Sequence, residues 1–139
     1  MSTRTNLCAV PGITVGHVTI EAHGTGCTVI LGPEAGLRAA VCVRGRATGT
    51  RELDVLDPRH LVERIDAILF TGGSALGLGA ADGVMRWLRE RGRGLPVGDK
   101  GTIPIVPSAV IFDLGNAGKP LGSPSPDDVY RACDNARAD

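Results

Sequence analysis

Aromatic side chains are scarce in this sequence: two Phe, one Trp and one Tyr make up 3% of the 139 residues. Proteins that bind single-stranded nucleic acid stack bases on several aromatic rings, so this scarcity argues against that class. An excess of one charge is also lacking, because 15 basic residues balance 15 acidic ones. The balance argues against a strongly electrostatic nucleic-acid binder and against a polybasic protein of the membrane surface.

Long apolar runs and a secretory signal are missing as well. Apolar runs such as 67–70 have the length of a strand, far short of the roughly 20 residues that span a bilayer. The N-terminal region has no apolar segment of the kind found in signal peptides. We therefore expect no membrane partner, a cytoplasmic location, and free thiols at Cys8, Cys27, Cys42 and Cys133.

What is present indicates one folded α/β unit. The length suits one domain, and 42% hydrophobic against 22% charged residues exclude a disordered tail. The first third predicts a β-meander with strands at 13–20, 27–31 and 38–43, with a bulge or bend at Gly16 and a turn at 24–26.

The rest of the sequence alternates helix and strand signals. Asp57-Pro58 predicts a short helix with Leu61, Val62 and Ile65 on its apolar face. A buried strand at 66–71 leads through a tight loop into a helix from Ser74 to about Arg91, which Gly92 ends. Further predicted elements are an extended segment at 103–107, a strand at 109–114 and a loop at 115–126.

The last predicted helix starts with a strong signal. Ser125 is a cap, Pro126 suits the first helical position, and Asp127 and Asp128 lie near the positive end of the helix dipole. No glycine or basic last turn ends this helix before residue 139. A truncated chain and a frayed natural terminus both explain that ending.

Gly72, Gly73 and Ser74 form the first candidate site. A glycine turn between a strand and a helix exposes amide groups that suit an anion or a developing oxyanion. The turn departs from known phosphate and nucleophile motifs, since it has no Lys and Leu76 replaces the last glycine of G-x-S-x-G. The alternative is a tight turn with Ser74 as a helix cap. We expect a positive φ or a close backbone approach at Gly72 or Gly73.

Other polar groups have a functional and a structural interpretation. Arg44, Arg46 and Arg51 could bind a carboxylate or phosphate, or could be solvated loop charges. Asp54 and Asp57 could chelate a metal, although a helix cap explains Asp57. The spacing of His17, His23 and Cys27 allows a metal site, whereas a core cysteine beside two turn histidines explains it without one.

The order of several motifs is more informative than any one of them. These are GITVGH at 12–17, GTRE at 49–52, LDP at 56–58, TGGSALGL at 71–78, AADGVMRWL at 80–88, IPIVP at 103–107 and AVIFDL at 109–114. Together they resemble the N-terminal part of the DmpA-type self-processing aminopeptidases. That family includes L-aminopeptidase/D-esterases, β-peptidyl aminopeptidases and nylon-oligomer hydrolases.

The resemblance implies a fold and a chemistry. The fold would be part of a four-layer α-β-β-α sandwich, as in ornithine acetyltransferases. Family members cleave their own precursor before a Ser or Thr, which becomes an N-terminal nucleophile whose free amino group can act as base. They hydrolyse small peptides or amides without metal or organic cofactor, and they form oligomers.

The resemblance also implies roles for some residues of this sequence, whereas part of the family's active site has no match in it. Tyr130 lies where the family has a tyrosine near the oxyanion, although a helix-surface tyrosine is the alternative. Gly72, Gly73 and Ser74 are the expected substrate-binding residues. Nothing in 1–139 matches the family's nucleophile segment, so we expect a single incomplete domain that is inactive alone and lacks its β-chain or C-terminal half. The alternatives are a non-catalytic or partner-binding remnant and an independent anion-binding unit.

Overall fold

The computed structural model describes residues 6–138 and has the predicted α/β architecture. The strands are β1 (Thr14–Ile20), β2 (Thr25–Leu31), β3 (Thr50–Arg51), β4 (Ala67–Thr71), β5 (Leu95–Pro96), β6 (Thr102–Ile103) and β7 (Ser108–Val110). The α-helices are α1 (Ala81–Arg89) and α2 (Pro126–Asp134). The 3-10 helices are η1 (Leu7–Ala9), η2 (Glu21–His23), η3 (Asp54–Leu56), η4 (Ser74–Ala80), η5 (Gly98–Lys100) and η6 (Asn116–Gly118). Among residues 6–138, no helix is long and apolar enough to cross a bilayer.

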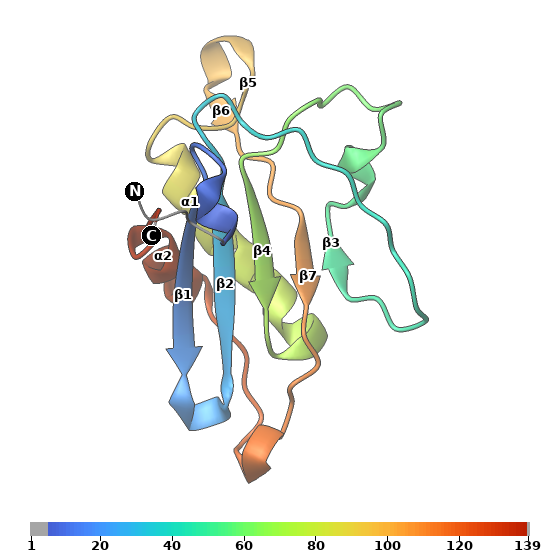
Figure 1. Ribbon diagram of the computed structural model, residues 1–139, viewed down its shortest axis with the longest axis vertical. Helices are drawn as coiled ribbons and strands as arrows, with labels where there is room; N and C mark the ends of the chain where they lie inside the picture. The colour runs from blue at the N-terminus through green and yellow to red at the C-terminus, as the bar shows by residue number, and fades with distance from the viewer. Residues whose placement is uncertain (1–5, 139) are drawn as a thin grey trace.

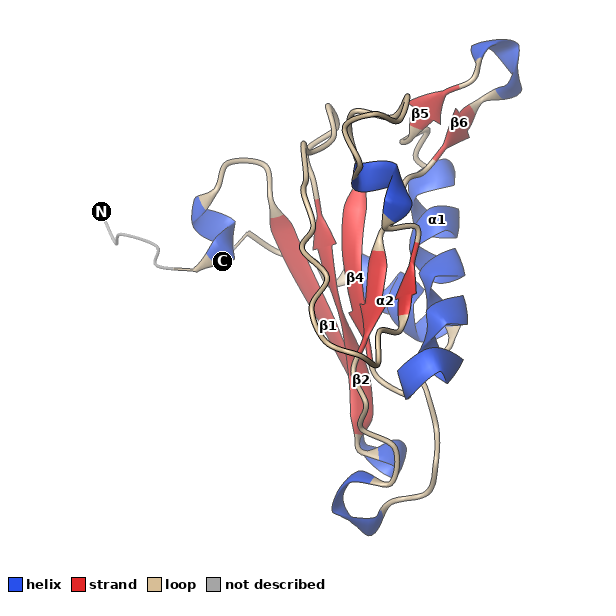
Figure 2. Cartoon of the chain, turned by 90° about the vertical axis from the view of Figure 1, so that its right-hand side faces the viewer, coloured by secondary structure: helices blue, strands red, loops and turns tan. Residues whose placement is uncertain are grey.

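Five strands form the main sheet in the order β1-β2-β4-β7-β3. β2 pairs antiparallel with both β1 and β4. β4 and β7 run parallel, and the chain connects them through η4, α1 and the small β5–β6 hairpin. Both α-helices cover the same face of this sheet (Figures 1 and 2). Residues 6–138 therefore form one main sheet with a layer of α-helices on one face, plus the small β5–β6 hairpin.

The core lies between the sheet and these helices. Alternate residues of β2 and β4 point toward the helices, and Val29 and Leu69 are completely buried there. Val84 and Leu88 of α1 and Val129 of α2 meet them from the other side. The period of two along each strand thus sorts one set of side chains into the core.

Within residues 6–138, the opposite face of the sheet carries no α-helix, although the 3-10 helix η3 borders it through Leu56. Ile68 and Phe70 of β4 point to this face, and Phe70 is 41% exposed. The loop that contains Ala39 and Val41 lies against these two side chains and lines a small cavity with them. We call this surface the open face.

The predicted strand at 38–43 is wrong. Residues 38–43 form no strand or bridge; the bridge between Leu37 and Ile65 lies just before them, and Val41 and Val43 are 46% and 53% exposed. The position beside β2 belongs to β4, which pairs with β2 from residue 67 to residue 71. The first third therefore forms a hairpin of β1 and β2 and no meander.

The predicted helix at 57–65 is also wrong. The 3-10 helix η3 precedes it, and the Asp57 carboxylate accepts a hydrogen bond from the Arg59 amide, which closes a turn. Leu61 is 92% exposed, whereas Ile65 is buried through its bridge to Leu37. Since these apolar residues do not share one face, no amphipathic helix forms.

Gly16 has a different role from the predicted bulge. The pairing of β1 with β2 continues through Gly16 without an extra residue. A Cβ atom at Gly16 would lie 1.8 Å from the carbonyl oxygen of Ala132 in α2. The glycine therefore allows helix α2 to approach the strand closely.

The remaining predicted boundaries differ in detail. The helix at 74–91 begins as η4 and continues as α1, and Gly92 ends it with a φ of +65°. The strand at 109–114 is shorter, as β7 ends at Val110. Helix α2 ends at Asp134, after which Arg137 exchanges two backbone hydrogen bonds with Val15 of β1.

Candidate functional site

The turn at Gly72–Ser74 connects β4 to η4 at the lower end of the sheet in Figure 1. Gly73 has a φ of +78° and Ser74 one of +53°, so the expected positive φ is confirmed. A Cβ atom at Gly73 would lie 2.6 Å from the Cα atom of Ser123. One at Gly72 would lie 2.0 Å from the Thr25 hydroxyl oxygen. Both positions therefore need glycine for close packing, and Gly73 needs it also for its conformation.

The three amide groups of this turn donate to acceptors within the chain. Gly72 N–H donates to the Gly26 carbonyl (2.8 Å) and Ser74 N–H to the Ile111 carbonyl (3.0 Å). Gly73 N–H donates to Oδ1 of Asp113 at 2.6 Å. The groups expected to bind an anion are thus engaged with the sheet and with a carboxylate. The part of Gly72, Gly73 and Ser74 in substrate binding stays a prediction.

Asp113 is the residue that sequence analysis missed at this site. Its Oδ2 accepts a hydrogen bond from the Thr25 hydroxyl at 2.7 Å, while its Oδ1 holds Gly73. The half-buried carboxylate thus joins the start of β2, the end of β4 and the chain after β7. These contacts span 88 and 40 positions, so no local pattern in the sequence could indicate them.

A cleft of about 380 Å³ on the open face reaches this carboxylate. His17, Thr28, Phe70 and Ile111 line it together with Asp113 and the backbone near Gly26. The His17 imidazole and the Thr28 hydroxyl are hydrogen-bonded across the strands at 2.9 Å. The cleft therefore has partly apolar walls, one imidazole–hydroxyl pair and a carboxylate.

The loop after Asp113 is fastened beside the cleft. Nδ1 of His23 lies 3.2 Å from the Pro120 carbonyl, and Lys119 pairs with Glu21 at 3.4 Å. Asn116 donates to the carbonyl of Gly24, which places η6 next to the β1–β2 connection at the bottom of Figure 1. These contacts connect two segments that lie far apart in the sequence.

The structure does not assemble His17, His23 and Cys27 into a metal-binding group. His23 contacts Pro120, whereas Cys27 faces the core between the sheet and the helices. Burial raises the pKa of the Cys27 thiol to about 11. No group of three or more His, Cys, Asp or Glu suited to a metal occurs in the described residues.

Tyr130 lies elsewhere in the molecule. Its hydroxyl donates to Oε2 of Glu90 just beyond the end of α1, and the guanidinium carbon of Arg86 lies 4.7 Å from its ring centre. The helical segment η4–α1 separates Glu90 from Ser74, a length of roughly 25 Å. The structure therefore does not bring Tyr130 to the Gly72–Ser74 turn, and its oxyanion role stays a prediction.

The other candidate polar residues have structural partners or lie in exposed loops. Arg51 of β3 pairs with Asp82 at 2.7 Å and reaches the carbonyl of Leu78, so it fastens the sheet edge to η4 and α1. Hydrogen bonds from Arg59 lower the pKa of Asp57 to about 2. Arg44 and Arg46 lie in the exposed loop before β3, and Asp54 begins η3.

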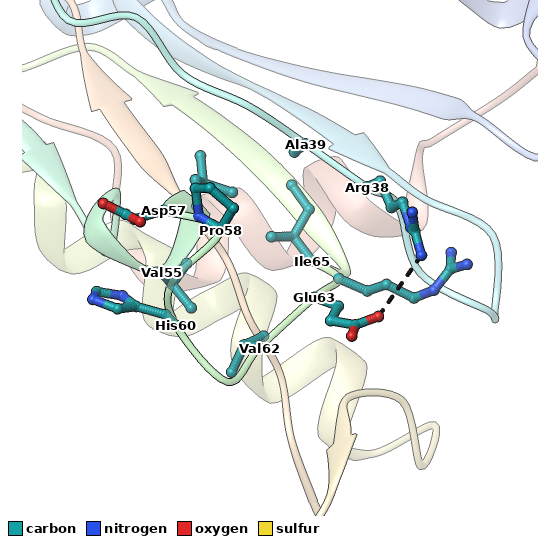
Figure 3. A pocket seen from close by; sticks show the side chains of 11 residues that line it. Arg38, Ala39, Val55, Asp57, Pro58, His60, Val62, Glu63 and Ile65 are labelled. Carbon is teal, nitrogen blue, oxygen red and sulfur yellow. Dashed lines mark ion pairs between the residues drawn. The ribbon is translucent and has the colours of Figure 1, made fainter.

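A second cavity, of about 310 Å³, lies between the loop at Arg38 and the segment from Val55 to Ile65 (Figure 3). Arg38 and Glu63 form an ion pair of 3.8 Å at its rim, and the side chains of both are 76% exposed. His60 and Asp57 lie at the other end (Figure 3). Because its charged groups are solvated and of both signs, we regard the cleft at Asp113 as the stronger candidate site.

Comparisons with known proteins agree with the motif pattern. The sequence matches Peptidase family S58 over residues 5–139. It is 49% identical over 142 residues to uncharacterized aminopeptidases of Mycobacterium tuberculosis and Mycobacterium bovis, and 47% identical over 135 residues to one of Mycobacterium leprae. These alignments cover 94% and 91% of this chain but 39% and 36% of the relatives, so the chain spans less than half of their length.

A solved structure has a similar fold. The PH0078 protein from Pyrococcus horikoshii superposes with a TM-score of 0.66 at 20% sequence identity. The superposition covers 94% of this chain and 40% of that protein. The sheet with its one helical layer therefore corresponds to part of a larger α/β fold.

Proposed function

The chain belongs to peptidase family S58, and on this premise we propose that it is the N-terminal portion of an aminopeptidase that hydrolyses small peptides or amides. One observation carries the proposal: the family match extends over residues 5–139, while the mycobacterial aminopeptidases continue well beyond the aligned part. We propose a DmpA-type chemistry, in which self-cleavage releases an N-terminal Ser or Thr nucleophile on a second chain.

The groups in the described part of the chain support a nucleophile supplied from elsewhere. Between residues 6 and 138, the hydrogen bond of Thr28 to His17 is the one that joins a hydroxyl to an imidazole. No carboxylate in this part of the chain orients His17, whereas an activated hydroxyl normally needs a base that is itself held in place. We therefore propose that the chain is inactive by itself. From the family resemblance, we also propose that the reaction uses neither metal nor organic cofactor.

The partners that we propose are the C-terminal half and further copies of the assembled protein. The open face supports this proposal, since Phe70 and Ile111 are 41% and 55% exposed there and the described residues place no α-helix or second sheet over this face. Exposed apolar sheet surface and short edge strands favour association. The four cysteines are free thiols, in keeping with a cytoplasmic location.

Complementation in two pieces tests the function. The chain would be purified alone and together with the part of the Mycobacterium tuberculosis relative that follows the aligned region. We expect no turnover of aminoacyl p-nitroanilides by the chain alone, and turnover by the pair after the second piece exposes its nucleophile. Size-exclusion chromatography on the same samples should show self-association of the chain alone and a defined complex for the pair.

Two results would contradict the proposal. A pair that forms a stable complex without turnover would favour a non-catalytic, partner-binding fragment. Turnover by the chain alone that survives purification and disappears in Thr28→Ala or Ser74→Ala would place the nucleophile within these residues. Cys42→Ser, which changes an exposed residue of the loop before β3, is the matched control for both variants.

A further inference from the structure

The chain between β7 and α2 contains a mostly exposed loop, residues 115–122, which we call the strap. It lies below the sheet in both views, next to the connection between β1 and β2 that contains η2 (Figures 1 and 2). Asp113 lies just before the strap and accepts a hydrogen bond from Gly73 N–H. Ser123 follows the strap and packs closely against the same glycine. The strap therefore connects the two residues that hold Gly73 in place.

The strap is attached to the rest of the molecule at one place. In the described part of the chain, the hydrogen bonds and the ion pair that join it to distant segments all end in residues 21–24. Asn116 donates to the Gly24 carbonyl at 3.3 Å, and Lys119 pairs with Glu21 at 3.4 Å. The Glu21 side chain is 84% exposed, so this ion pair contributes little to the attachment.

His23 is the half-buried residue of this attachment. Its Nδ1 lies 3.2 Å from the carbonyl oxygen of Pro120, and because a carbonyl can only accept, Nδ1 must carry a proton. The ring lies against Gly122, where a Cβ atom would be 2.3 Å from the ring carbon Cγ. The imidazole therefore holds the strap at two points, directly before Ser123.

The first half of the strap has the features of a hinge. Gly115 and Gly118 have φ values of +73° and +71°, and within residues 6–138 a Cβ atom at either position would have nothing within 4 Å. Ala117 lies between them with a φ of +54°, a left-handed conformation that is unfavourable for alanine. Two unhindered glycines beside a strained residue can change conformation easily, so the attachment to residues 21–24 is what keeps the hinge in its present position.

We propose that the strap is a movable flap and that His23 is the positioning residue that keeps it closed. When the imidazole releases the strap, the hinge turns and Ser123 moves away from Gly73. The turn at the end of β4 then loses the packing that holds its left-handed conformation. His23 therefore acts on this turn through the strap.

The flap also borders the cleft at Asp113. Gly24 and Asp113 are among the residues that line this cleft, and Asn116 contacts both, through its side-chain amide and its backbone N–H. Opening of the flap removes these contacts and widens the cleft beside η2. The flap would work in the same way whether or not the protein is a hydrolase.

Hydrogen exchange of the labelled intact chain, followed by NMR at low urea concentrations, tests the flap without any variant. We expect the Gly73 amide to exchange through local opening, which exposes little surface, so its rate should hardly change with urea. The buried Leu69 amide donates to the Pro107 carbonyl at 3.1 Å and should exchange more slowly, with a rate that rises steeply with urea. The same urea dependence for both amides would overturn the proposal, since the turn would then open only when the whole chain unfolds.

Variants test the part of His23. In His23→Ala we expect the Gly73 amide to exchange roughly fivefold faster, the effect of losing one hydrogen bond that holds the flap closed. His23→Asn places an amide N–H donor near the position of Nδ1 and should recover part of the protection. His60→Ala changes an exposed histidine of the loop after η3 and should leave the exchange of Gly73 unchanged. Unchanged exchange in His23→Ala, or no recovery in His23→Asn, would overturn the role of His23.

A further measurement keeps the test decisive if His23→Ala does not fold. The nitrogen-15 chemical shifts of the neutral His23 ring in the wild type show which nitrogen carries the proton, and we expect it on Nδ1. A proton on Nε2 alone would overturn the proposal, because Nδ1 could not then donate to Pro120. Gly122→Ala pushes the strap away from the ring and should speed the exchange of Gly73 as His23→Ala does. Unchanged exchange of Gly73 in Gly122→Ala would likewise contradict the flap.

Discussion

The two helical segments that cover the sheet begin in different ways. Helix α2 is capped by its neighbours in sequence: Ser125 accepts from the Asp128 amide, the Asp128 carboxylate accepts from the Ser125 amide, and Pro126 takes the first position. The segment η4–α1 has Gly73 at its start and no side-chain cap of its own. Its first amides are satisfied by Asp113 and Ile111, which lie about 40 positions away.

This difference separates local from tertiary control of structure. A capping box needs four consecutive residues and works in an isolated helix. The Gly72–Ser74 turn needs the sheet, the Asp113 carboxylate and the loop at Ser123 to be in place. We therefore expect substitutions in the Gly72–Ser74 turn to lower the free energy of unfolding more than substitutions in the capping box of α2.

Gly73→Ala should have the largest effect. The new Cβ would lie 2.6 Å from the Cα atom of Ser123 on a backbone with a φ of +78°. Left-handed strain and overpacking together predict a loss of about 2–4 kcal/mol in the free energy of unfolding. Urea unfolding followed by circular dichroism measures it.

The control for Gly73→Ala is Gly79→Ala, which lies in the same segment. A Cβ atom there has nothing within 4 Å. We expect no loss of stability and a small gain from the better helix propensity of alanine. Equal stability of the two variants would remove the argument for close packing at the turn.

Asp113→Ala should have the second-largest effect, a loss of about 2 kcal/mol in the free energy of unfolding. It leaves the Gly73 amide and the Thr25 hydroxyl without their acceptor in a partly buried place. A double-mutant cycle with Thr25→Val isolates the side-chain pair by urea unfolding. If the effects of the two substitutions simply add, Asp113 and Thr25 do not stabilise the turn together.

The same contrast explains which parts of the structure sequence analysis could predict. The start of α2 was predictable because Ser125, Pro126 and Asp128 act within one turn, and the strand at 66–71 was predictable from its short apolar run. The segment 38–43 has a similar composition to a strand, but the place beside β2 belongs to β4, whose pairing is non-local.

At the candidate site, too, sequence analysis could predict local features but not contacts between distant residues. The positive φ at Gly73 follows from a short connection between strand and helix, so the sequence could predict it. The engagement of its amide with Asp113, and the approach of α2 to Gly16, depend on residues 40 and more than 100 positions away. The role of Asp113 therefore required the structure.

Ser125→Ala tests the capping box of α2 and should lower the free energy of unfolding by about 1 kcal/mol. The substitution removes the acceptor of the Asp128 amide but leaves the apolar face of α2 on the core. Ser125→Asn restores a capping side chain and should recover most of the loss in urea unfolding. A loss for Ser125→Ala as large as that for Asp113→Ala would contradict the contrast between the two starts.

The smallest expected effect is the contribution of the Asp128 carboxylate, at the start of α2, to the pH dependence of the free energy of unfolding. Burial raises the pKa of Asp128, but hydrogen bonds from Ser125 and the neighbouring Arg131 outweigh it and hold the pKa below its usual range. A carboxyl group whose pKa is lower in the folded than in the unfolded chain stabilises the fold above its ordinary pKa, about 3.9. That contribution is lost as the pH falls through the ordinary pKa toward the lower folded value. Asp128→Asn should therefore flatten the fall in unfolding free energy below about pH 5, while Asp99→Asn, outside the capping box, should not. Parallel pH curves for the wild type and Asp128→Asn would show that the ionised form of Asp128 adds nothing to the cap, whose stability would then rest on the Ser125 hydroxyl and on Pro126.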